Sequence, residues 1–243
     1  MKVLIINLKS TKDRWEEFLR RNTNALLDCD IKRIEAIDGR EIINMDLKSK
    51  LISSSAIEGW TAGAIGAALS HMYCWRVCIK SGEPLVIMED DVILARNWYR
   101  TLVKLLNQGS KMVLLGWNLD SMLQATMFEN QEIISLFEPA YPDENHISKL
   151  VNSKEPRQSI NLSHCFGLPA YWITPSTAQE LLKLIKPLAI KEIKFKRGIP
   201  TCYSTGIDGL LNLFYTTVGA KITVPPLAIA TNQQSRSLTR FRG

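Results

Sequence analysis

Three consecutive carboxylates, Glu89-Asp90-Asp91, follow an apolar run at residues 85–88. Adjacent carboxylates repel one another, and this cost is relieved when they bind a cation or stay well solvated. Successive side chains of an extended segment point to opposite sides, so Glu89 and Asp91 share one side and Asp90 takes the other. Oxygen ligands of this kind suit Mg²⁺ or Mn²⁺ better than Zn²⁺ or copper. We therefore expect Glu89 and Asp91 to bind Mn²⁺ or Mg²⁺; the alternative is an acidic loop at a strand end.

A cation at this triplet can bridge the two phosphates of a nucleotide diphosphate and offset the charge of a leaving group. Ligands of open α/β sheets collect at the carboxyl ends of strands. Asn7 and Arg14 flank the first strand-to-helix turn and can hold uracil, ribose or pyrophosphate; a turn-capping amide and a surface guanidinium are the simpler alternative. Asp38-Gly39 ends the second predicted strand, where Asp38 can bind a ribose or only shape the turn.

Two of the three histidines are candidates for the site: His71 within a predicted apolar helix, and His164 near a predicted strand. His71 sits on an otherwise apolar helix, so it is either a hydrogen-bonded core residue or part of the site. His164 comes just before a strand and is a candidate to complete the metal shell or to contact a phosphate. Cys74 and Cys78, four residues apart on one helical face, are expected to pack in the core rather than to form half of a zinc site.

Apolar patterns predict alternating strands and helices as far as residue 115. Strands are expected at residues 3–8, 31–37, 85–88 and 112–115, and helices near 10–27, 61–80 and 98–106. Further strands are expected at 167–173 and 222–224, and further helices at 174–185 and 208–215. This alternation favours an α/β fold with a mainly parallel central sheet flanked by helices.

Residues 118–161 show no clear period and contain three prolines. A long irregular segment in a compact domain is typical of a binding loop, so we expect an acceptor-binding or lid region there. No linker, repeat or low-complexity tract divides the 243 residues. The sequence therefore predicts one domain over residues 1–243, with a basic tail at 232–243.

The composition bears on where the protein works. The N-terminal apolar run is too short for a signal peptide, and no stretch approaches the roughly 20 apolar residues of a membrane span, so a cytoplasmic location is expected. The net charge of +6 suggests an anionic partner. Two basic clusters are either solvated surface or a peripheral contact with anionic lipid at the inner face of the inner membrane: Lys191, Lys194, Lys196 and Arg197, and Arg236, Arg240 and Arg242.

The chain resembles glycosyltransferase family 25, the bacterial lipooligosaccharide galactosyl- and glucosyltransferases related to the collagen galactosyltransferases. Matching segments occur in the family's order at residues 6–8 with 13–14, 36–40, 63–71, 88–92, 114–116, 167–173, 207–208 and 224–226. Two positions depart from the family pattern. Ala64 stands where an acidic residue is usual, and Gly209 stands where an aromatic residue commonly follows the aspartate.

The resemblance implies a GT-A type nucleotide-sugar fold, a UDP-hexose donor with galactose favoured, Mn²⁺ or Mg²⁺, and inversion at the anomeric carbon. Inversion by direct displacement needs a base that takes the proton of the acceptor hydroxyl. Asp208 is the expected base because it aligns with a family aspartate, although a helix N-cap is the simpler role, and Asp120 is the reserve candidate. The donor is expected to be held by Asn7, Arg14, Asp38, Gly39, His71 and Asp90.

By the same resemblance, the expected acceptor is the outer part of a lipooligosaccharide, or LPS, and no nucleic acid is expected as a partner. Two other classes of protein stay open. A metal-dependent phosphodiesterase or nuclease would also use an acidic cluster, but should carry a second cluster for a two-metal site. A non-catalytic glycan-binding module should bind glycan without UDP.

Overall fold

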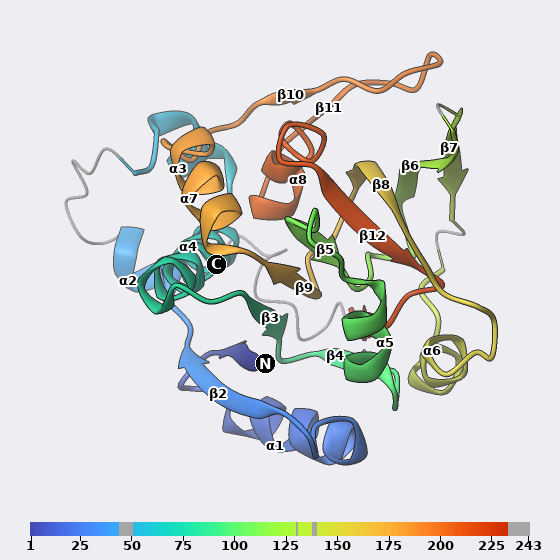
Figure 1. Ribbon diagram of the computed structural model, residues 1–243. Coiled ribbons are helices and arrows are strands. Elements are labelled where there is room, and N and C mark those ends of the chain that lie inside the picture. Colours follow the sequence, from blue (N-terminus) through green and yellow to red (C-terminus); the bar gives the residue numbers. More distant parts are fainter. Residues whose placement is uncertain (44–50, 130, 138–139, 233–243) are drawn as a thin grey trace.

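The computed structural model describes residues 1–43, 51–129, 131–137 and 140–232. Its centre is a nine-stranded sheet with the strand order β2-β1-β3-β9-β5-β12-β8-β6-β7 (Figure 1). The pairings give one direction to β1, β2, β3, β5, β12 and β6, and the opposite direction to β9, β8 and β7. The expected α/β class with a central sheet between helices is confirmed. The sheet is mixed, because β9 and β8 are inserted antiparallel to their neighbours.

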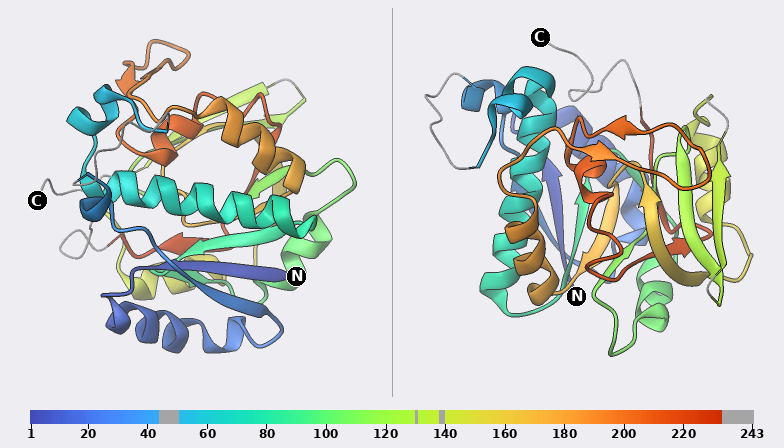
Figure 2. Two further views of the ribbon diagram at one scale, coloured as in Figure 1. Left: turned by 90° about the vertical axis from the view of Figure 1, so that its left-hand side faces the viewer. Right: turned by 90° about the horizontal axis from the view of Figure 1, so that it is seen from above.

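Three parallel strands form the N-terminal part of the sheet: β1 (Lys2–Asn7), β2 (Asp30–Glu35) and β3 (Leu85–Glu89). β1 lies between the other two, and its residues 3–7 are buried, as its continuous apolar sequence predicts. Helices connect these strands: α1 (Lys12–Asn22), the 3₁₀ turn η1 (Thr23–Ala25), α2 (Gly39–Ile43), α3 (Ser54–Gly59) and α4 (Ala62–Ser81). α1 lies on one face of these strands and α4 on the other (Figure 2).

α4 is the long helix that covers one face of the sheet, and α7 (Pro175–Leu184) lies beside it (Figure 2). The Thr61 side chain accepts a hydrogen bond from Ala64 N at 3.0 Å, which caps the helix start. Gly82 ends the helix in the left-handed region at φ 71°, where glycine carries no steric cost. The predicted helix at 61–80 is confirmed. Both Cys74 and Cys78 are buried free thiols, and burial raises the pKa of Cys74 to about 12, so they pack in the core as expected.

The region at 118–161 is more regular than its sequence suggests, which corrects the expectation of a long irregular segment. It contains the hairpin β6 (Met122–Phe128) and β7 (Gln131–Leu136), helix α6 (Glu144–Val151) and the start of β8 (Gln158–Cys165). β7 is the edge strand and is only half-buried, so it lacks a clear apolar alternation. β6 buries the polar Gln124, which interrupts the pattern of that strand as well.

The remaining elements complete the second half of the central sheet and form two small two-stranded sheets beside it. They are β4 (Val92–Leu94), α5 (Trp98–Leu105), β5 (Met112–Leu114), β9 (Ala170–Ile173), β10 (Glu192–Ile193), β11 (Cys202–Tyr203), α8 (Ile207–Leu211), β12 (Ala220–Val224) and β13 (Ala228–Ala230). β13 pairs with β4, the strand that directly follows the acidic triplet in the sequence. Among the described residues, no helix combines the length and apolar character needed to cross a bilayer.

The two predicted basic clusters differ in what the structure says of them. Lys194 and Lys196 form ion pairs with Glu192 at 3.3 Å and Glu132 at 2.6 Å. The basic residues of the predicted tail at 232–243 lie outside the described residues, which end at Asn232. The expected contact with anionic lipid therefore stays a prediction.

Candidate active site

A cavity of about 760 Å³ opens where β1 and β3 end. The predicted site residues among its lining are Asn7, Arg14, Asp38, Gly39, His71, Glu89, Asp90, Asp91 and Asp208. They come from five separate parts of the chain that the topology gathers at one edge of the sheet. Parallel strands bring their carboxyl ends together, which explains the meeting of Asn7 with the acidic triplet.

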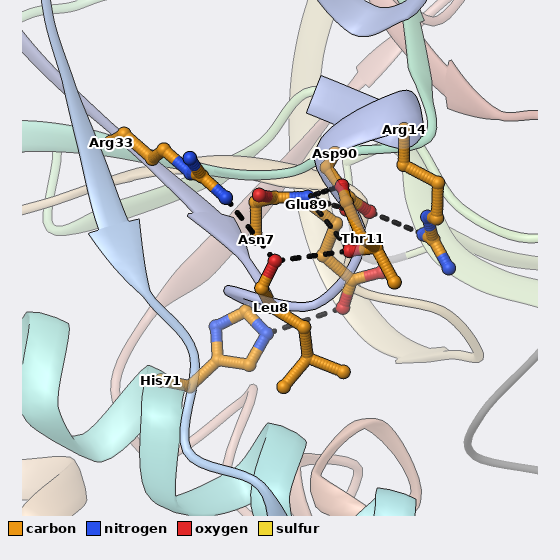
Figure 3. A network of polar contacts seen from close by, with 8 residues as sticks. All are labelled: Asn7, Leu8, Thr11, Arg14, Arg33, His71, Glu89 and Asp90. Atoms are coloured by element: carbon orange, nitrogen blue, oxygen red, sulfur yellow. Dashed lines mark hydrogen bonds and ion pairs between the residues drawn. The ribbon is translucent and has the colours of Figure 1, made fainter. Parts of the chain in front are cut away.

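Asp90 lines this cavity and is held by two partners from the first strand-to-helix turn (Figure 3). Asn7 Nδ2 donates to Asp90 Oδ2 at 2.5 Å, and Arg14 forms an ion pair with Asp90 Oδ1. The Asp90 side chain is only 8% exposed. Burial raises the pKa of Asp90, whereas Arg14 and Asn7 act to lower it. Asp90 is therefore a fixed carboxylate that orients Arg14 and Asn7.

Asp91 differs from Asp90 because one of its oxygens is buried without a hydrogen-bond partner. This atom is Oδ1, while the backbone oxygen of Asp91 accepts from Thr231 N at 2.9 Å. Burial, followed by the charge of Glu89, raises the pKa of Asp91 to about 7. An orphaned carboxylate oxygen next to a second carboxylate is a chemical fit for a hard divalent cation. Among the described residues no group of three or more metal-ligating side chains occurs, so further ligand oxygens for a cation here would come from water or a bound diphosphate.

Glu89 is in contact with His71, whose Nε2 lies 3.2 Å from Glu89 Oε1 (Figure 3). His71 Nδ1 lies 2.9 Å from the hydroxyl of Tyr171, which also accepts a hydrogen bond from Trp75 Nε1 at 2.8 Å. His71 is 1% exposed, and both Trp75 and Tyr171 are fully buried. His71 is thus both a hydrogen-bonded core residue and part of the cavity wall.

The Asp38-Gly39 turn forms another wall of the cavity. Asp38 accepts hydrogen bonds from the backbone N and the guanidinium of Arg40, and the guanidinium lowers the pKa of Asp38. Gly39 packs directly on α4, since a Cβ there would lie 1.7 Å from Ala62 O. Ser70 accepts from Ile37 N at 2.8 Å and fixes the same turn to the helix. The Asp38 carboxylate is therefore engaged within its own turn.

Asp208 enters the cavity from α8, near the C-terminal end of the described chain. It is not the N-cap of this helix: the cap position is Gly206, and no side chain caps the helix. Asp208 Oδ2 instead accepts a hydrogen bond from Gly167 N at 2.9 Å. Gly167 has φ +84°, and a Cβ there would lie 2.3 Å from the Asn118 side chain. The tight turn at Gly167 thus fixes the orientation of the Asp208 carboxylate.

Two predicted site residues lie elsewhere. His164 does not line the cavity; it lies on β8, with its Nδ1 3.1 Å from Gln124 Oε1 and its ring against Phe195. β8 is four strand positions from β3, or about 19 Å at the usual strand spacing, so His164 cannot complete a metal shell at Glu89. Asp120 also lies outside the cavity lining, and its Oδ2 accepts from Asn232 at 3.1 Å.

Several residues of the cavity lining, and Tyr171 behind it, escaped sequence reasoning. Thr11 accepts from Asn7 Nδ2 at 3.1 Å, and Arg21 lines the cavity while it forms ion pairs with Glu17 and Glu144. Thr11 lies between Asn7 and Arg14 in the sequence, so the first turn as a whole was the available signal. Tyr171 lies within the matching segment 167–173 but has no charge or motif to mark it. Its contact with His71 spans 100 residues and depends on the strand order.

A family model described as glycosyltransferase family 25 (LPS biosynthesis protein) matches residues 1–194. The chain belongs to glycosyltransferase family 25. The family 25 match takes in α1, α4, β3 with the residues that follow it, and β9, and therefore Arg14, His71, the acidic triplet and Tyr171. It ends before Asp208, which lines the same cavity.

The solved structures that match this chain are distant in sequence. A Bacillus anthracis protein assigned as a glucose-1-phosphate thymidylyltransferase is 12% identical, with TM-score 0.37, over 90% of this family 25 chain and 65% of its own. This chain thus spans about two thirds of that protein. The inositol-1-phosphate CTP transferase of T. maritima is 10% identical, with TM-score 0.39, over 91% and 84%. The mannose-1-phosphate geranyltransferase of Thermus thermophilus is 10% identical, with TM-score 0.35, over 91% and 72%.

Proposed function

We propose that this family 25 glycosyltransferase moves a hexose, with galactose favoured, from a UDP-sugar to a hydroxyl of a lipooligosaccharide or LPS acceptor, with inversion at the anomeric carbon. The observation that carries the proposal is the shared cavity. It brings the acidic pair Glu89 and Asp91, the cationic Arg14 and the separate carboxylate Asp208 to one place. These groups suit binding of a diphosphate, its departure, and activation of an incoming hydroxyl.

In this proposal Glu89 and Asp91 hold Mn²⁺ or Mg²⁺ together with the donor diphosphate. The bound cation would supply Lewis-acid stabilisation of the charge on the departing UDP. The orphaned Asp91 Oδ1 supports the assignment, because a buried carboxylate oxygen without a partner costs free energy until a cation or proton satisfies it.

The turn between β1 and α1 is proposed to bind the nucleotide part of the donor. Arg14 is held by Asp90 with its side chain 20% exposed, so its guanidinium reaches the cavity in a fixed orientation. A guanidinium suits phosphate oxygens, which accept two parallel N–H donors. Asp90 then acts by orienting Arg14 and Asn7. The Asp38-Gly39 turn is proposed to form the wall against the ribose and base.

Asp208 is proposed as the base that accepts the proton of the attacking hydroxyl. Its position supports this role, because the carboxylate lines the cavity and comes from an element separate from the acidic triplet. The hydrogen bond from Gly167 N orients the carboxylate and leaves Oδ1 as the second acceptor atom. A base held in this way fits general-base catalysis, in which geometry is the first requirement.

The alternative classes fit less well. A two-metal phosphodiesterase needs a larger ligand cluster than the described residues provide. A glycan-binding module has no use for an acidic pair and an oriented arginine in one cavity.

We further propose that the enzyme works at the cytoplasmic face of the inner membrane, where its basic clusters meet anionic lipid near a lipid-linked acceptor.

The proposal is tested with the purified protein, Mn²⁺ and a panel of UDP-sugars. We expect UDP release from UDP-galactose, acceleration by a lipooligosaccharide acceptor, and loss of release in EDTA. Linkage analysis of the product reports the stereochemistry. Absence of both binding and hydrolysis of every nucleotide sugar at millimolar concentration, with metal present, would contradict the enzyme assignment.

A further inference from the structure

The buried contacts behind Glu89 have a definite hydrogen-bond direction. Trp75 Nε1 can only donate, so it occupies one acceptor position of the Tyr171 hydroxyl. A carboxylate only accepts, so His71 Nε2 donates to Glu89 Oε1. Every group then has a partner if the Tyr171 hydroxyl donates to His71 Nδ1, at 2.9 Å. The hydrogen bonds therefore run in one direction, from Trp75 through Tyr171 and His71 to Glu89.

We propose that Tyr171 is a positioning residue of the donor site, which acts through His71 to hold the Glu89 carboxylate in the orientation that binds the cation. The inference rests on the proposed function and assigns a role to a residue outside the cavity. Tyr171 and Trp75 are absent from the cavity lining, whereas His71 and Glu89 belong to it. The Tyr171 hydroxyl is linked to the cavity through the imidazole of His71.

The sheet fixes where the tyrosine hydroxyl lies. β9 pairs antiparallel with β3, and Tyr171 is opposite Ile87, two residues before Glu89. Tyr171 and Trp75 are fully buried, and α4 supplies both Trp75 and His71, four residues apart on one helical face. The ring of a phenylalanine would fill the same space in the core. The hydroxyl is needed only for the polar contacts that lead to Glu89.

Glu89 needs such a support because its neighbours repel it. Its side chain is 35% exposed, and Asp90 and Asp91 follow it directly. Without a fixed donor, the carboxylate would lower its repulsion by turning toward water. The hydrogen bond from His71 keeps Oε1 against the core, which leaves Oε2 as the oxygen for the cavity. A ligand held in place before the cation binds loses less side-chain entropy on binding.

The direct test is Tyr171→Phe, which removes one buried hydroxyl and keeps the ring. Mn²⁺ affinity is measured by calorimetry in the presence of UDP, so the readout does not depend on turnover. Loss of a residue that contacts a metal ligand typically lowers metal affinity by about 10- to 100-fold. Tyr171 is one contact further from the cation, so we expect a loss near the lower limit, about tenfold. The matched control is Tyr215→Phe, the same change at another fully buried tyrosine, for which we expect wild-type affinity.

A double-mutant cycle separates positioning from packing. His71→Gln removes the imidazole that links Tyr171 to Glu89, and it should weaken Mn²⁺ binding by itself. Adding Tyr171→Phe to His71→Gln should then change the affinity less than twofold, because residues that act through one another are not additive. His71→Gln also provides an independent measurement if Tyr171→Phe lowers the thermal stability of the protein.

Each outcome has one meaning. Wild-type Mn²⁺ affinity in folded Tyr171→Phe would overturn this inference and leave the proposed function intact. If Tyr171→Phe lowers Mn²⁺ affinity as much in the His71→Gln background as in the wild type, the inference is also overturned, since the effect of Tyr171 would not pass through the imidazole. No Mn²⁺ binding by the wild-type protein with UDP would instead overturn the metal role in the proposed function, and this inference with it.

Discussion

Asn7 and Asp90 are 83 positions apart in the sequence and are joined by a 2.5 Å hydrogen bond where β1 and β3 end side by side. Arg14 reaches the other oxygen of the same carboxylate from α1. One buried acid therefore fixes both the end of a strand and the first turn of the following helix. Stability and donor binding should depend on this group together.

Arg14→Gln should lower the free energy of unfolding by about 3 kcal/mol, because it leaves the Asp90 charge buried without its cationic partner. Adding Asp90→Asn should recover part of the loss. Urea unfolding of the single and double variants measures both effects. The matched control is Arg100→Gln, which removes an exposed pair 3.8 Å long with Asp28 and should change stability by at most about 0.5 kcal/mol. Equal losses in both variants would contradict a special role for Asp90.

Asp208→Asn should reduce kcat by about 10²- to 10⁴-fold, because an amide cannot accept the proton of the acceptor hydroxyl. Binding of UDP and Mn²⁺ should stay within threefold of wild type. Steady-state kinetics and calorimetry test the two parts separately. Asp120→Asn is the comparison, since Asp120 lies outside the cavity lining and its loss should leave turnover near wild type. A large loss of kcat in Asp120→Asn with near wild-type kcat in Asp208→Asn would assign the base to Asp120.

Asp91 should make the metal-free protein less stable as pH rises. Its pKa is about 7 in the folded protein, raised first by burial and then by Glu89, and near 3.8 in the unfolded chain. Folding therefore takes up a proton between about pH 4 and 7, and this contribution is present below pH 4 and lost as pH passes 7. Asp91→Asn should accordingly raise Tm at pH 8 and have little effect near pH 4.

Addition of metal should reverse the order at pH 8. Mn²⁺ with UDP should raise the Tm of the wild type, because a ligand that binds only the folded state stabilises it, and should leave Asp91→Asn nearly unchanged. Scanning calorimetry at pH 4 to 8, with and without Mn²⁺, measures both effects. A wild-type Tm that is independent of pH and metal would show that folding does not raise the pKa of Asp91 and that Asp91 is not a metal ligand.

Gly39→Ala should disturb the wall of the cavity, because the added methyl would lie 1.7 Å from Ala62 O and 2.9 Å from Gly66 N. We expect a destabilisation of about 3 kcal/mol, or a decrease in Tm of about 6–12 °C, with weaker UDP binding. Gly109→Ala is the matched control, because its nearest neighbour would be 3.6 Å away. Similar melting temperatures for the two variants would show that the turn can move away from α4.

Much of this site follows from local sequence. The apolar runs of β1 and β3 and the helical period of α4 predicted their own positions, and the strand ends then indicated Asn7 and the acidic triplet. Parallel pairing brings such strand ends together. The carboxylates of Glu89 and Asp91 could therefore be assigned to one cavity before any tertiary contact was known.

The remaining errors come from information that lies in the strand order. β9 is inserted between β3 and β5 and brings Tyr171 to His71, whereas β8 carries His164 four positions away from β3. Nothing in the sequence near His164 distinguishes these two placements. The half-buried edge strand β7 and the buried Gln124 of β6 likewise have patterns that reflect their neighbours rather than a period of their own.

The pairing of β13 with β4 has a consequence for protein synthesis. Thr231 N donates to Asp91 O, and Asp208 arrives only with α8, so the cavity draws on residues near both ends of the described chain. A nascent polypeptide that has only β1 to β9 outside the ribosome carries the acidic triplet. It lacks β13 and Thr231, which contact β4 and Asp91 in the folded protein. Products of premature termination that stop before Asp208 should therefore lack part of the cavity wall and the proposed base.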